Sequence, residues 1–184
     1  MLTDELSLAQ QDGGPPAALA GSAQGETGVS IVSLRFEGSA HVSGVPRRHL
    51  VWFNLSPPNR FDCRIAGRQL RHEPPVGSLA ICPAGVESIA NTTHTFDTLV
   101  VGIDPNRFAL AAAERSALQA RLDGCLTACD AVLLDIARSL ASERASRYVN
   151  GPLFWNGLAQ RFVDGLLTRF SAVDESRARG RLGR

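Results

Sequence analysis

The four histidines are the side chains best suited to bind a metal or transfer a proton, but their spacing favours neither role. His41, His49, His72 and His94 are isolated from one another, and no His-x-His pair occurs. A catalytic metal normally needs three protein ligands that converge on one point. The sequence also lacks Gly-x-Ser-x-Gly, a phosphate-binding glycine loop and His-Glu-x-x-His. We therefore expect no catalytic residue, no metal ion and no cofactor.

The four cysteines also fail to form a recognisable site. Cys63, Cys82, Cys125 and Cys129 are too few and too scattered for the disulfide framework of a secreted domain. The spacing of Cys125 and Cys129 predicts that both lie on one face of a helix. Since no further ligand stands near them in sequence, we expect two small buried side chains.

Trp52 and Asn54 are the first candidates for binding a small molecule. Both lie on one face of the apolar segment 49–55, while Val51 and Phe53 alternate on the other face. An aromatic wall with a few polar groups is typical of a ligand pocket. We expect Trp52 and Asn54 to line such a pocket. The alternative is a core tryptophan and an asparagine that faces solvent.

Five further residues complete the predicted ligand-binding set: Arg64, Ile81, Ser88, His94 and Phe96. An inward-facing Arg64 would bind a carboxylate through two parallel hydrogen bonds, whereas the alternative is a solvated arginine. His94 shares a strand face with Phe96 and would hydrogen-bond a ligand, unless it is an edge histidine with partners of its own.

Short segments with a period of two must position these residues. In residues 28–104, Val32, Leu34 and Phe36 alternate with polar residues, as expected for a strand with one buried face. Further candidate strands, separated by Pro- and Gly-rich turns, are 49–55, 60–66, 68–73, 78–82, 87–91 and 95–103. This close spacing predicts an antiparallel barrel or jelly roll of seven or eight strands.

Residues 105–171 change to a helical period. Asp104-Pro105 and Asn150-Gly151-Pro152 are helix starts. Between them, apolar residues recur at helical spacing in two further groups, Phe108, Ala111 and Ala112, and Leu133, Ile136, Ala137 and Leu140. The fold class is therefore α+β, with a mainly antiparallel barrel followed by two or three helices. Residues 1–27 are expected to be a mobile arm with at most a short helix near its start, and 172–184 a linker.

The last predicted helix has a broad apolar stripe. Leu158, Phe162, Leu166 and Phe170 form it, and Ala159, Val163 and Leu167 widen it. We expect this stripe to form a homodimer by packing against its two-fold mate. The alternative is that it packs only on its own barrel and on the preceding helix.

One local motif resembles a known family. Gly77-Ser-Leu-Ala-Ile-Cys-Pro83-Ala-Gly85 resembles the second conserved motif of cupins, in which a metal-binding histidine follows the last glycine. Ser88 occupies that position here. The first cupin motif, with its closely spaced histidine pair, is absent. The resemblance therefore implies a cupin-like barrel without a metal.

The order of elements over residues 29–170 resembles the N-terminal half of AraC-family transcriptional regulators. This resemblance implies a metal-free cupin barrel that binds a small effector, helices that form a homodimer, and an arm that closes over the barrel. It also implies a DNA-binding half with two helix-turn-helix motifs, for which the residues after Phe170 are too few. We expect this chain to be the sensor part of a longer regulator and to make no direct contact with nucleic acid.

The overall composition agrees with a sensor domain of this kind. The chain has 184 residues, 44% hydrophobic and 20% charged, with a net charge of +1 and arginine as its only strongly basic residue type. This balance does not favour a nucleic-acid binder. No apolar run approaches the ~20 residues of a membrane span, and no signal peptide is recognisable. We expect a cytoplasmic sensor and not an enzyme. The alternatives are a metal-dependent cupin enzyme, such as an isomerase or dioxygenase, and a dimerisation module that binds no ligand.

Overall fold

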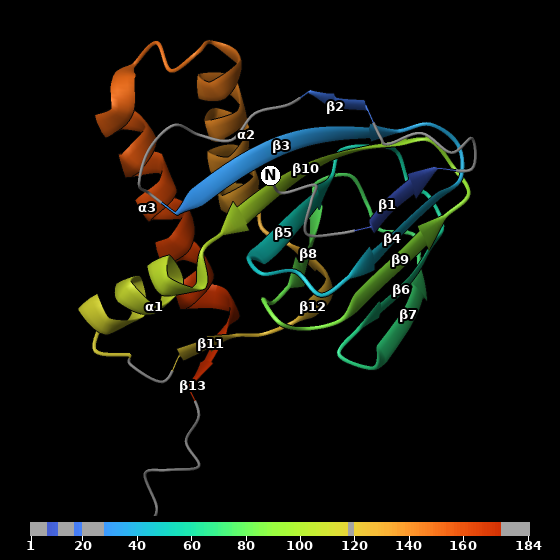
Figure 1. Cartoon of the computed structure of the whole chain (residues 1–184), viewed down its shortest axis with the longest axis horizontal. Coiled ribbons are helices and arrows are strands. Elements are labelled where there is room, and N and C mark those ends of the chain that lie inside the picture. Colours follow the sequence, from blue (N-terminus) through green and yellow to red (C-terminus); the bar gives the residue numbers. More distant parts are fainter. Residues whose placement is uncertain (1–6, 11–16, 20–27, 118–119, 174–184) are drawn as a thin grey trace, which may run out of the picture.

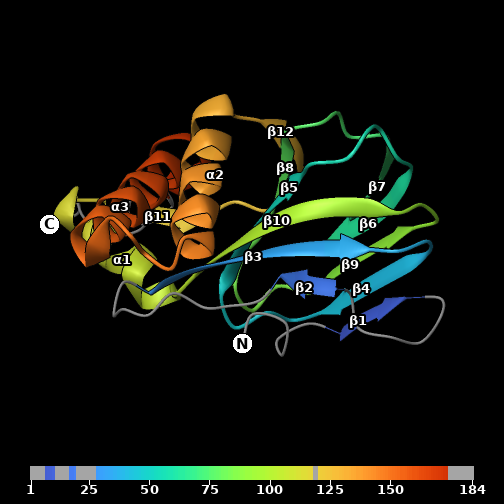
Figure 2. The same cartoon turned by 90° about the horizontal axis from the view of Figure 1, so that it is seen from above.

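The computed structural model describes residues 7–10, 17–19, 28–117 and 120–173. Strands of two facing sheets form a flattened barrel, and the helices lie together on one side of it (Figures 1 and 2). No helix in the described part of the chain is long and apolar enough to cross a membrane.

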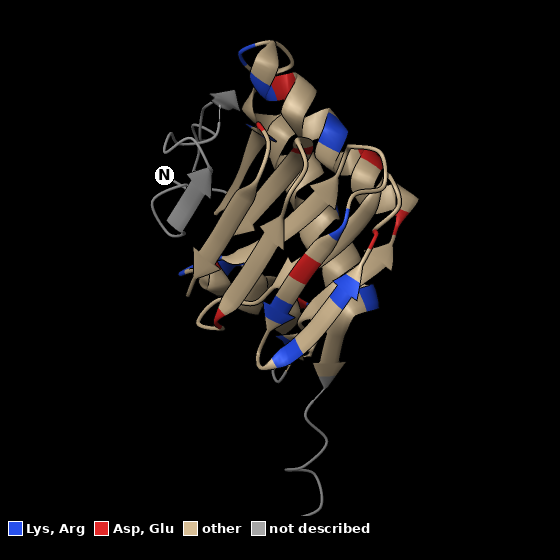
Figure 3. Cartoon of the chain, turned by 90° about the vertical axis from the view of Figure 1, so that its right-hand side faces the viewer, with Lys and Arg blue, Asp and Glu red and all other residues tan. Residues whose placement is uncertain are grey.

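The first sheet has five strands in the order β1-β4-β9-β6-β7, and all neighbours are antiparallel. Its strands are β1 (Ser7–Gln10), β4 (Ala40–Gly44), β9 (Ser88–Thr92), β6 (Phe61–Ile65) and β7 (Arg68–His72). Exposed ion pairs lie on or beside these strands, as between Arg71 and Asp62 at 2.9 Å and between Arg64 and Glu87 at 3.3 Å. Basic and acidic residues are interspersed on this side of the molecule (Figure 3).

The second sheet has six strands in the order β12-β8-β5-β10-β3-β2. They are β12 (Cys125–Cys129), β8 (Ser78–Cys82), β5 (His49–Asn54), β10 (Phe96–Ile103), β3 (Val29–Phe36) and β2 (Ala17–Leu19). Both faces of this sheet are buried in the middle, which explains why β8 and β10 are almost continuously apolar. Val100 and its alternating neighbours face the barrel interior, whereas Val101 and its neighbours pack against the helices.

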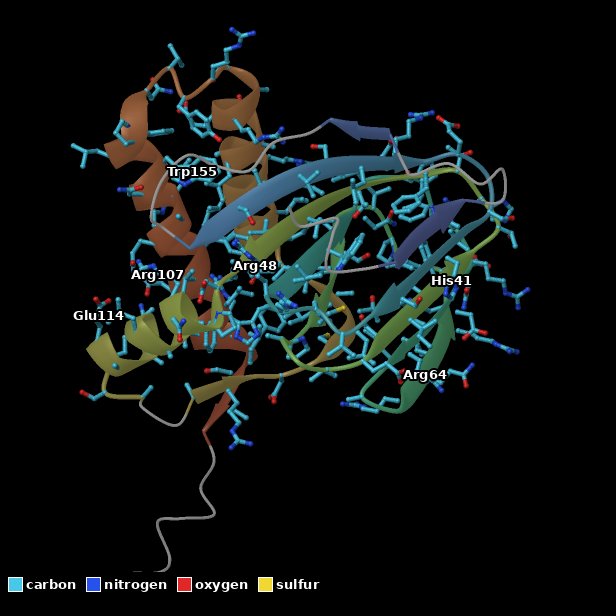
Figure 4. The ribbon with its side chains drawn as sticks, viewed as in Figure 1. His41, Arg48, Arg64, Arg107, Glu114 and Trp155 are labelled. Carbon is cyan, nitrogen blue, oxygen red and sulfur yellow. The ribbon has the colours of Figure 1, made fainter. Side chains whose placement is uncertain are left out.

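Three helices cover the outer face of the second sheet: α1 (Pro105–Glu114), α2 (Ala131–Ala145) and α3 (Gly151–Phe170). Asp104 and Asp130 cap α1 and α2, with side-chain oxygens that accept hydrogen bonds from Asn106 N and Leu133 N. The predicted helix starts at Asp104-Pro105 and Asn150-Gly151 are therefore confirmed. Trp155 lies between α2 and α3 (Figure 4).

The segment between α1 and α2 differs from the predicted helical region. It contains two strands, β11 (Ala120–Leu122) and β12, and β12 extends the second sheet by pairing with β8. The prediction that Cys125 and Cys129 lie on a helix and are buried is wrong. Both belong to β12, Cys125 is half-buried and Cys129 is exposed. Residues four apart share a face in a strand as well as in a helix, so the spacing alone did not separate the two.

The two ends of the chain also contain strands. β1 and β2 lie within the predicted mobile arm and pair with β4 and β3. The remainder of the arm, and residues 174–184 of the predicted linker, lie outside the described residues. Ser171–Val173 forms β13, which pairs with β11.

The apolar stripe of α3 is covered by the chain's own fold. Leu158, Phe162 and Leu166 are buried in the core between the sheet and the helices, and Phe170 packs against it. The Phe162 ring lies 6.2 Å from that of Phe53 on β5. The three residues beside the stripe are buried as well. Within the chain this face is covered by the second sheet, which is the alternative stated for the stripe, and a homodimer stays a prediction.

Candidate ligand-binding site

A cavity of about 100 Å³ lies inside the barrel, between the two sheets. On the same scale, one water molecule needs only about 10–15 Å³. Its wall is mostly apolar and includes three aromatic rings, those of Trp52, Phe61 and Phe96. Phe61 and Phe96 meet edge to face at 5.2 Å, which fixes the orientation of both rings. None of the lining residues is Asp, Glu, Lys or Arg.

Four of the seven predicted ligand-binding residues line this cavity: Trp52, Asn54, Ser88 and Phe96. They come from β5, β9 and β10, and strand alternation turns each of them inward. Whether they touch a ligand remains a prediction.

The other three predicted residues do not line the cavity. Ile81 is fully buried but faces the helices, because it is one position out of step with its inward-facing neighbours Ala80 and Cys82. Arg64 projects from the outside of β6, where it pairs with Glu87 (Figure 4). His94 is exposed in the bend before β10, so it does not share the strand face of Phe96.

Asn54 holds one end of the cavity in shape. Its amide nitrogen donates to the carbonyl oxygens of Pro74 and Pro75, at 3.0 and 3.3 Å, and its side-chain oxygen accepts from Ser56 N. The backbone oxygen of Asn54 also accepts from Gly77 N at 2.7 Å. Asn54 therefore fixes the turn before β8, and its hydrogen-bonding groups are already occupied by the protein.

His72 is a cavity residue that was not among the predicted set. It ends β7 opposite Phe61, and its ring lies 6.4 Å from the Phe61 ring. Its Nδ1 atom is buried and has no hydrogen-bond partner. Burial lowers the pKa of His72 below its ordinary value, which favours the neutral ring. In sequence, His72 follows the polar run Arg68-Gln69-Leu70-Arg71, and this run gave no sign that the strand has an inward face.

Two cysteines add neutral, polarisable groups to the wall. Burial raises the pKa of the Cys63 thiol to about 11 and that of the Cys82 thiol to about 12. A hydrogen bond with Ser88 opposes the rise for Cys82. Both thiols are therefore protonated at neutral pH, and the cavity carries no net charge.

The Gly-Pro-Gly motif flanks β8, with Gly77 in the turn before the strand and Pro83 and Gly85 in the turn after it. Gly77 and Gly85 adopt positive φ angles of 83° and 75°, which side-chain-bearing residues rarely adopt. The His49 ring accepts a hydrogen bond from Ala84 N at its Nδ1 atom, at 3.0 Å. Among the described residues, no group of three or more His, Cys, Asp or Glu could hold a metal ion.

One lining residue comes from outside the predicted barrel. Leu126 on β12 reaches the cavity, and the pairing of β12 with β8 shifts register between Cys125 and Ala128. Such a bulge places an extra residue and re-aims its neighbours. β12 ends directly before Asp130, which caps α2 and forms an ion pair with Arg169 of α3 at 3.2 Å. A short stretch of chain therefore connects the cavity wall to two helices.

Comparison with known proteins gives similarity of fold without close sequence similarity. No family model and no curated protein matches the chain. The AraC-like transcriptional activator CuxR matches over 96% of this chain and 66% of its own length, with a TM-score of 0.58 and 10% identity. Two other structures are more distant. The match to a cupin domain of Schizosaccharomyces pombe Cnp3 covers 60% of this chain and 74% of that one, with a TM-score of 0.39 and 13% identity. The match to an oxalate decarboxylase of Bacillus subtilis covers 42% of this chain and 21% of that one, with a TM-score of 0.36 and 16% identity.

The chain spans about two thirds of the activator and about a fifth of the decarboxylase. The match to the activator includes the helices as well as the barrel, since it covers nearly the whole chain. The predicted fold class is confirmed: a cupin-like, mainly antiparallel barrel followed by helices. The predicted resemblance to an AraC-type domain is confirmed at the level of the fold.

Proposed function

We propose that this chain is the effector-sensing domain of a transcriptional regulator, and that it binds a small molecule inside the barrel. The observation that carries the proposal is the apolar, uncharged cavity between the two sheets. The fold shared with an AraC-like activator supports it. Binding is the activity we assign, because the wall is mostly apolar and the side chain of Asn54 is already hydrogen-bonded to the neighbouring turns.

We propose that β12 passes the binding event to the helices. A ligand that contacts Leu126 favours one position of β12, and β12 continues into the capped start of α2. The Asp130–Arg169 ion pair ties this point to α3, and the Asp130 side chain is only 8% exposed. The ligand then shifts the population between two arrangements of α2 and α3 by its difference in affinity for them. We propose that a DNA-binding domain outside this chain responds to that shift.

The test of the proposal is a thermal-melt screen of small molecules against the protein and two cavity-filling variants, Ala80→Leu and Ala90→Leu. Both alanines line the cavity from opposite sheets, so at least one variant is expected to fold with less room inside. A true effector at 100 times its Kd stabilises the native protein by about 2.7 kcal/mol. We expect this stabilisation to disappear in the filled variants and to persist in His94→Ala, outside the cavity.

Stabilisation that survives in both filled variants would place the ligand elsewhere and contradict the proposal. Leu126→Ala serves as the test of the relay. It is expected to weaken the ligand-induced change in hydrogen exchange of α2 more than it weakens binding itself. Equal losses in both would show that Leu126 only contributes to the pocket.

A further inference from the structure

The inner face of the second sheet carries a hydroxyl group that the protein leaves without a partner. Ser78 begins β8 and lines the cavity, on the same strand face as Ala80 and Cys82. Its side-chain oxygen makes no hydrogen bond within the part of the chain that the structure describes. In that part, the fully buried side-chain nitrogen and oxygen atoms without a partner are His72 Nδ1 and Glu143 Oε2. The Ser78 oxygen therefore keeps some accessible surface. Because Ser78 is otherwise enclosed, with 2% of its surface exposed, that surface borders the cavity.

Trp52 supplies a second polar group on the neighbouring strand. Its indole N–H has no hydrogen-bond partner among the described residues, and its side chain lines the same cavity. Trp52 pairs with Ala80 in the ladder between β5 and β8, so Ser78 is its diagonal neighbour on one face of the sheet. Diagonal neighbours are about 7–8 Å apart, a distance that an aromatic side chain spans. The hydroxyl and the indole N–H are therefore within reach of one small ligand.

Three other polar side chains of the wall are already engaged within the protein. Asn54 bonds three backbone groups of the neighbouring turns. The Thr98 hydroxyl donates to the Phe53 carbonyl oxygen at 2.8 Å. Ser88 bonds the Cys82 thiol. We therefore assign the binding of a polar ligand group to the two side chains that lack a partner.

The surroundings of Ser78 select against a charged ligand. No carboxylate, guanidinium or ammonium group lines the cavity, so a charge placed against Ser78 would leave water without gaining a partner. Burial raises the pKa values of the Cys63 and Cys82 thiols to about 11 and about 12, so both stay neutral. The rings of Phe61 and Phe96 add an apolar surface. The body of the ligand must therefore be uncharged and mainly apolar.

We propose that the cavity recognises a small, uncharged, mainly apolar molecule with a carbonyl group, and that the Ser78 hydroxyl and the Trp52 indole N–H donate hydrogen bonds to the carbonyl oxygen. A serine hydroxyl can donate or accept, whereas an indole N–H can only donate. A carbonyl oxygen has two lone pairs, so it accepts from both donors at once. This inference rests on the proposed ligand-binding function and adds the class of ligand and the residues that select it.

The test uses four probes built on one six-membered ring. Cyclohexanone has the carbonyl group, and methylenecyclohexane has a CH₂ group of similar shape in place of the oxygen. Cyclohexanecarboxylate and cyclohexylammonium carry a negative and a positive charge. The dissociation constants are measured by ligand-observed NMR on the full chain. The decisive quantity is the Kd of methylenecyclohexane divided by the Kd of cyclohexanone, because a change in cavity shape affects both values alike.

We expect Ser78→Ala to lower this ratio about five-fold, since one hydrogen bond contributes about 1 kcal/mol and a factor of ten corresponds to about 1.4 kcal/mol. Trp52→Phe keeps an aromatic ring but removes the N–H, and it is expected to lower the ratio by a similar factor. Ser88→Ala is the matched control, because its hydroxyl in the same cavity already bonds the Cys82 thiol. It is expected to change the ratio by less than about two-fold. Both charged probes are expected to bind more weakly than cyclohexanone by about ten-fold or more.

The outcomes separate this inference from the proposed function. If both neutral probes bind and either Ser78→Ala or Trp52→Phe leaves the ratio unchanged, the two groups do not share a carbonyl oxygen. The inference is then wrong, while the ligand-binding function stands. An equal fall of the ratio in Ser88→Ala, or a charged probe that binds as tightly as cyclohexanone, would also overturn it. If neither neutral probe binds, the inference fails, and the thermal-melt screen still decides the proposed function.

Discussion

At the scale of single residues, His49 connects the acid stability of the barrel to one hydrogen bond. Its Nδ1 atom accepts the N–H of Ala84, which only an unprotonated nitrogen can do. Burial lowers the pKa of His49, and the negative charge of Asp104 partly opposes this. The unfolded chain therefore binds a proton at a higher pH than the folded protein does. The neutral His49 ring stabilises the folded protein fully above its ordinary pKa of 6.5. This stabilisation is lost as the pH falls through the lower pKa that His49 has in the folded protein.

We predict that His49→Asn makes the stability less sensitive to acid between about pH 7 and 5. Asparagine can still accept from Ala84 N but does not titrate. The comparison is made in a His72→Asn background, because burial also lowers the pKa of His72. Urea unfolding midpoints at several pH values are the measurement. Parallel curves with and without His49 would show that this ring does not control the acid response.

At the scale of elements, the contact between α2 and α3 depends on a glycine. A Cβ atom at Gly165 would lie 2.8 Å from Cδ2 of Leu133, closer than side-chain carbons normally approach. Gly157 lies on the same helix, with no atom within 4 Å of its Cβ position. The two glycines are therefore a matched pair: one permits close packing and the other only weakens the helix.

We predict opposite effects of the same substitution at these two sites. Gly165→Ala is expected to lower the free energy of unfolding by about 1–3 kcal/mol through overpacking. Gly157→Ala is expected to raise it by about 0.5–1 kcal/mol through helix propensity. Urea denaturation measures both. Stabilisation by Gly165→Ala would mean that Leu133 moves aside at little cost.

Most strands were predictable because their alternation survives in the sequence. Residues 49–55, 60–66 and 95–103 were expected as strands and contain β5, β6 and β10. β4 was missed because Ala-His-Val-Ser-Gly has only one large apolar residue. β12 was missed because its bulge breaks the period of two and its cysteine spacing also suits a helix.

The cavity was only partly predictable for a related reason. Alternation identifies the two faces of β5, so Trp52 and Asn54 were expected on one side. It does not give the phase of a strand buried on both faces, which is why Ile81 was assigned in place of Ala80 or Cys82. The α3 stripe shows the same limit, because helical periodicity marks a face for burial but does not say what covers it.

At the scale of the whole molecule, a different surface becomes the candidate for self-association. Val149, Leu153 and Phe154, here termed the α3 tip, are exposed large apolar residues at the start of α3, and Leu153 is 85% exposed. We retain the proposal of a homodimer and assign it to the α3 tip, since the predicted stripe is buried. Single apolar residues scattered over a surface are normal, whereas a cluster of them indicates an interaction site.

We predict that Leu153→Glu combined with Phe154→Glu weakens self-association at least ten-fold. Acidic residues are favourable in the first turn of a helix, so the fold of α3 is expected to tolerate them. Leu110→Glu, at an exposed apolar site on α1, is the control. Sedimentation equilibrium measures the association. Dimers of equal strength in both variants would exclude the α3 tip as the interface.

The pairing of β3 with β10 affects how this chain folds during its synthesis. Val29 pairs with Ile103, so the ribosome must add roughly 70 residues before the ladder can close. At about 5–20 residues per second, this interval is on the order of 4–14 s. During that time β3, with its apolar residues Val32, Leu34 and Phe36, has an unpaired edge that invites aggregation. Contacts between distant residues also slow folding, so we expect aggregation of the nascent chain to compete with closure of the barrel.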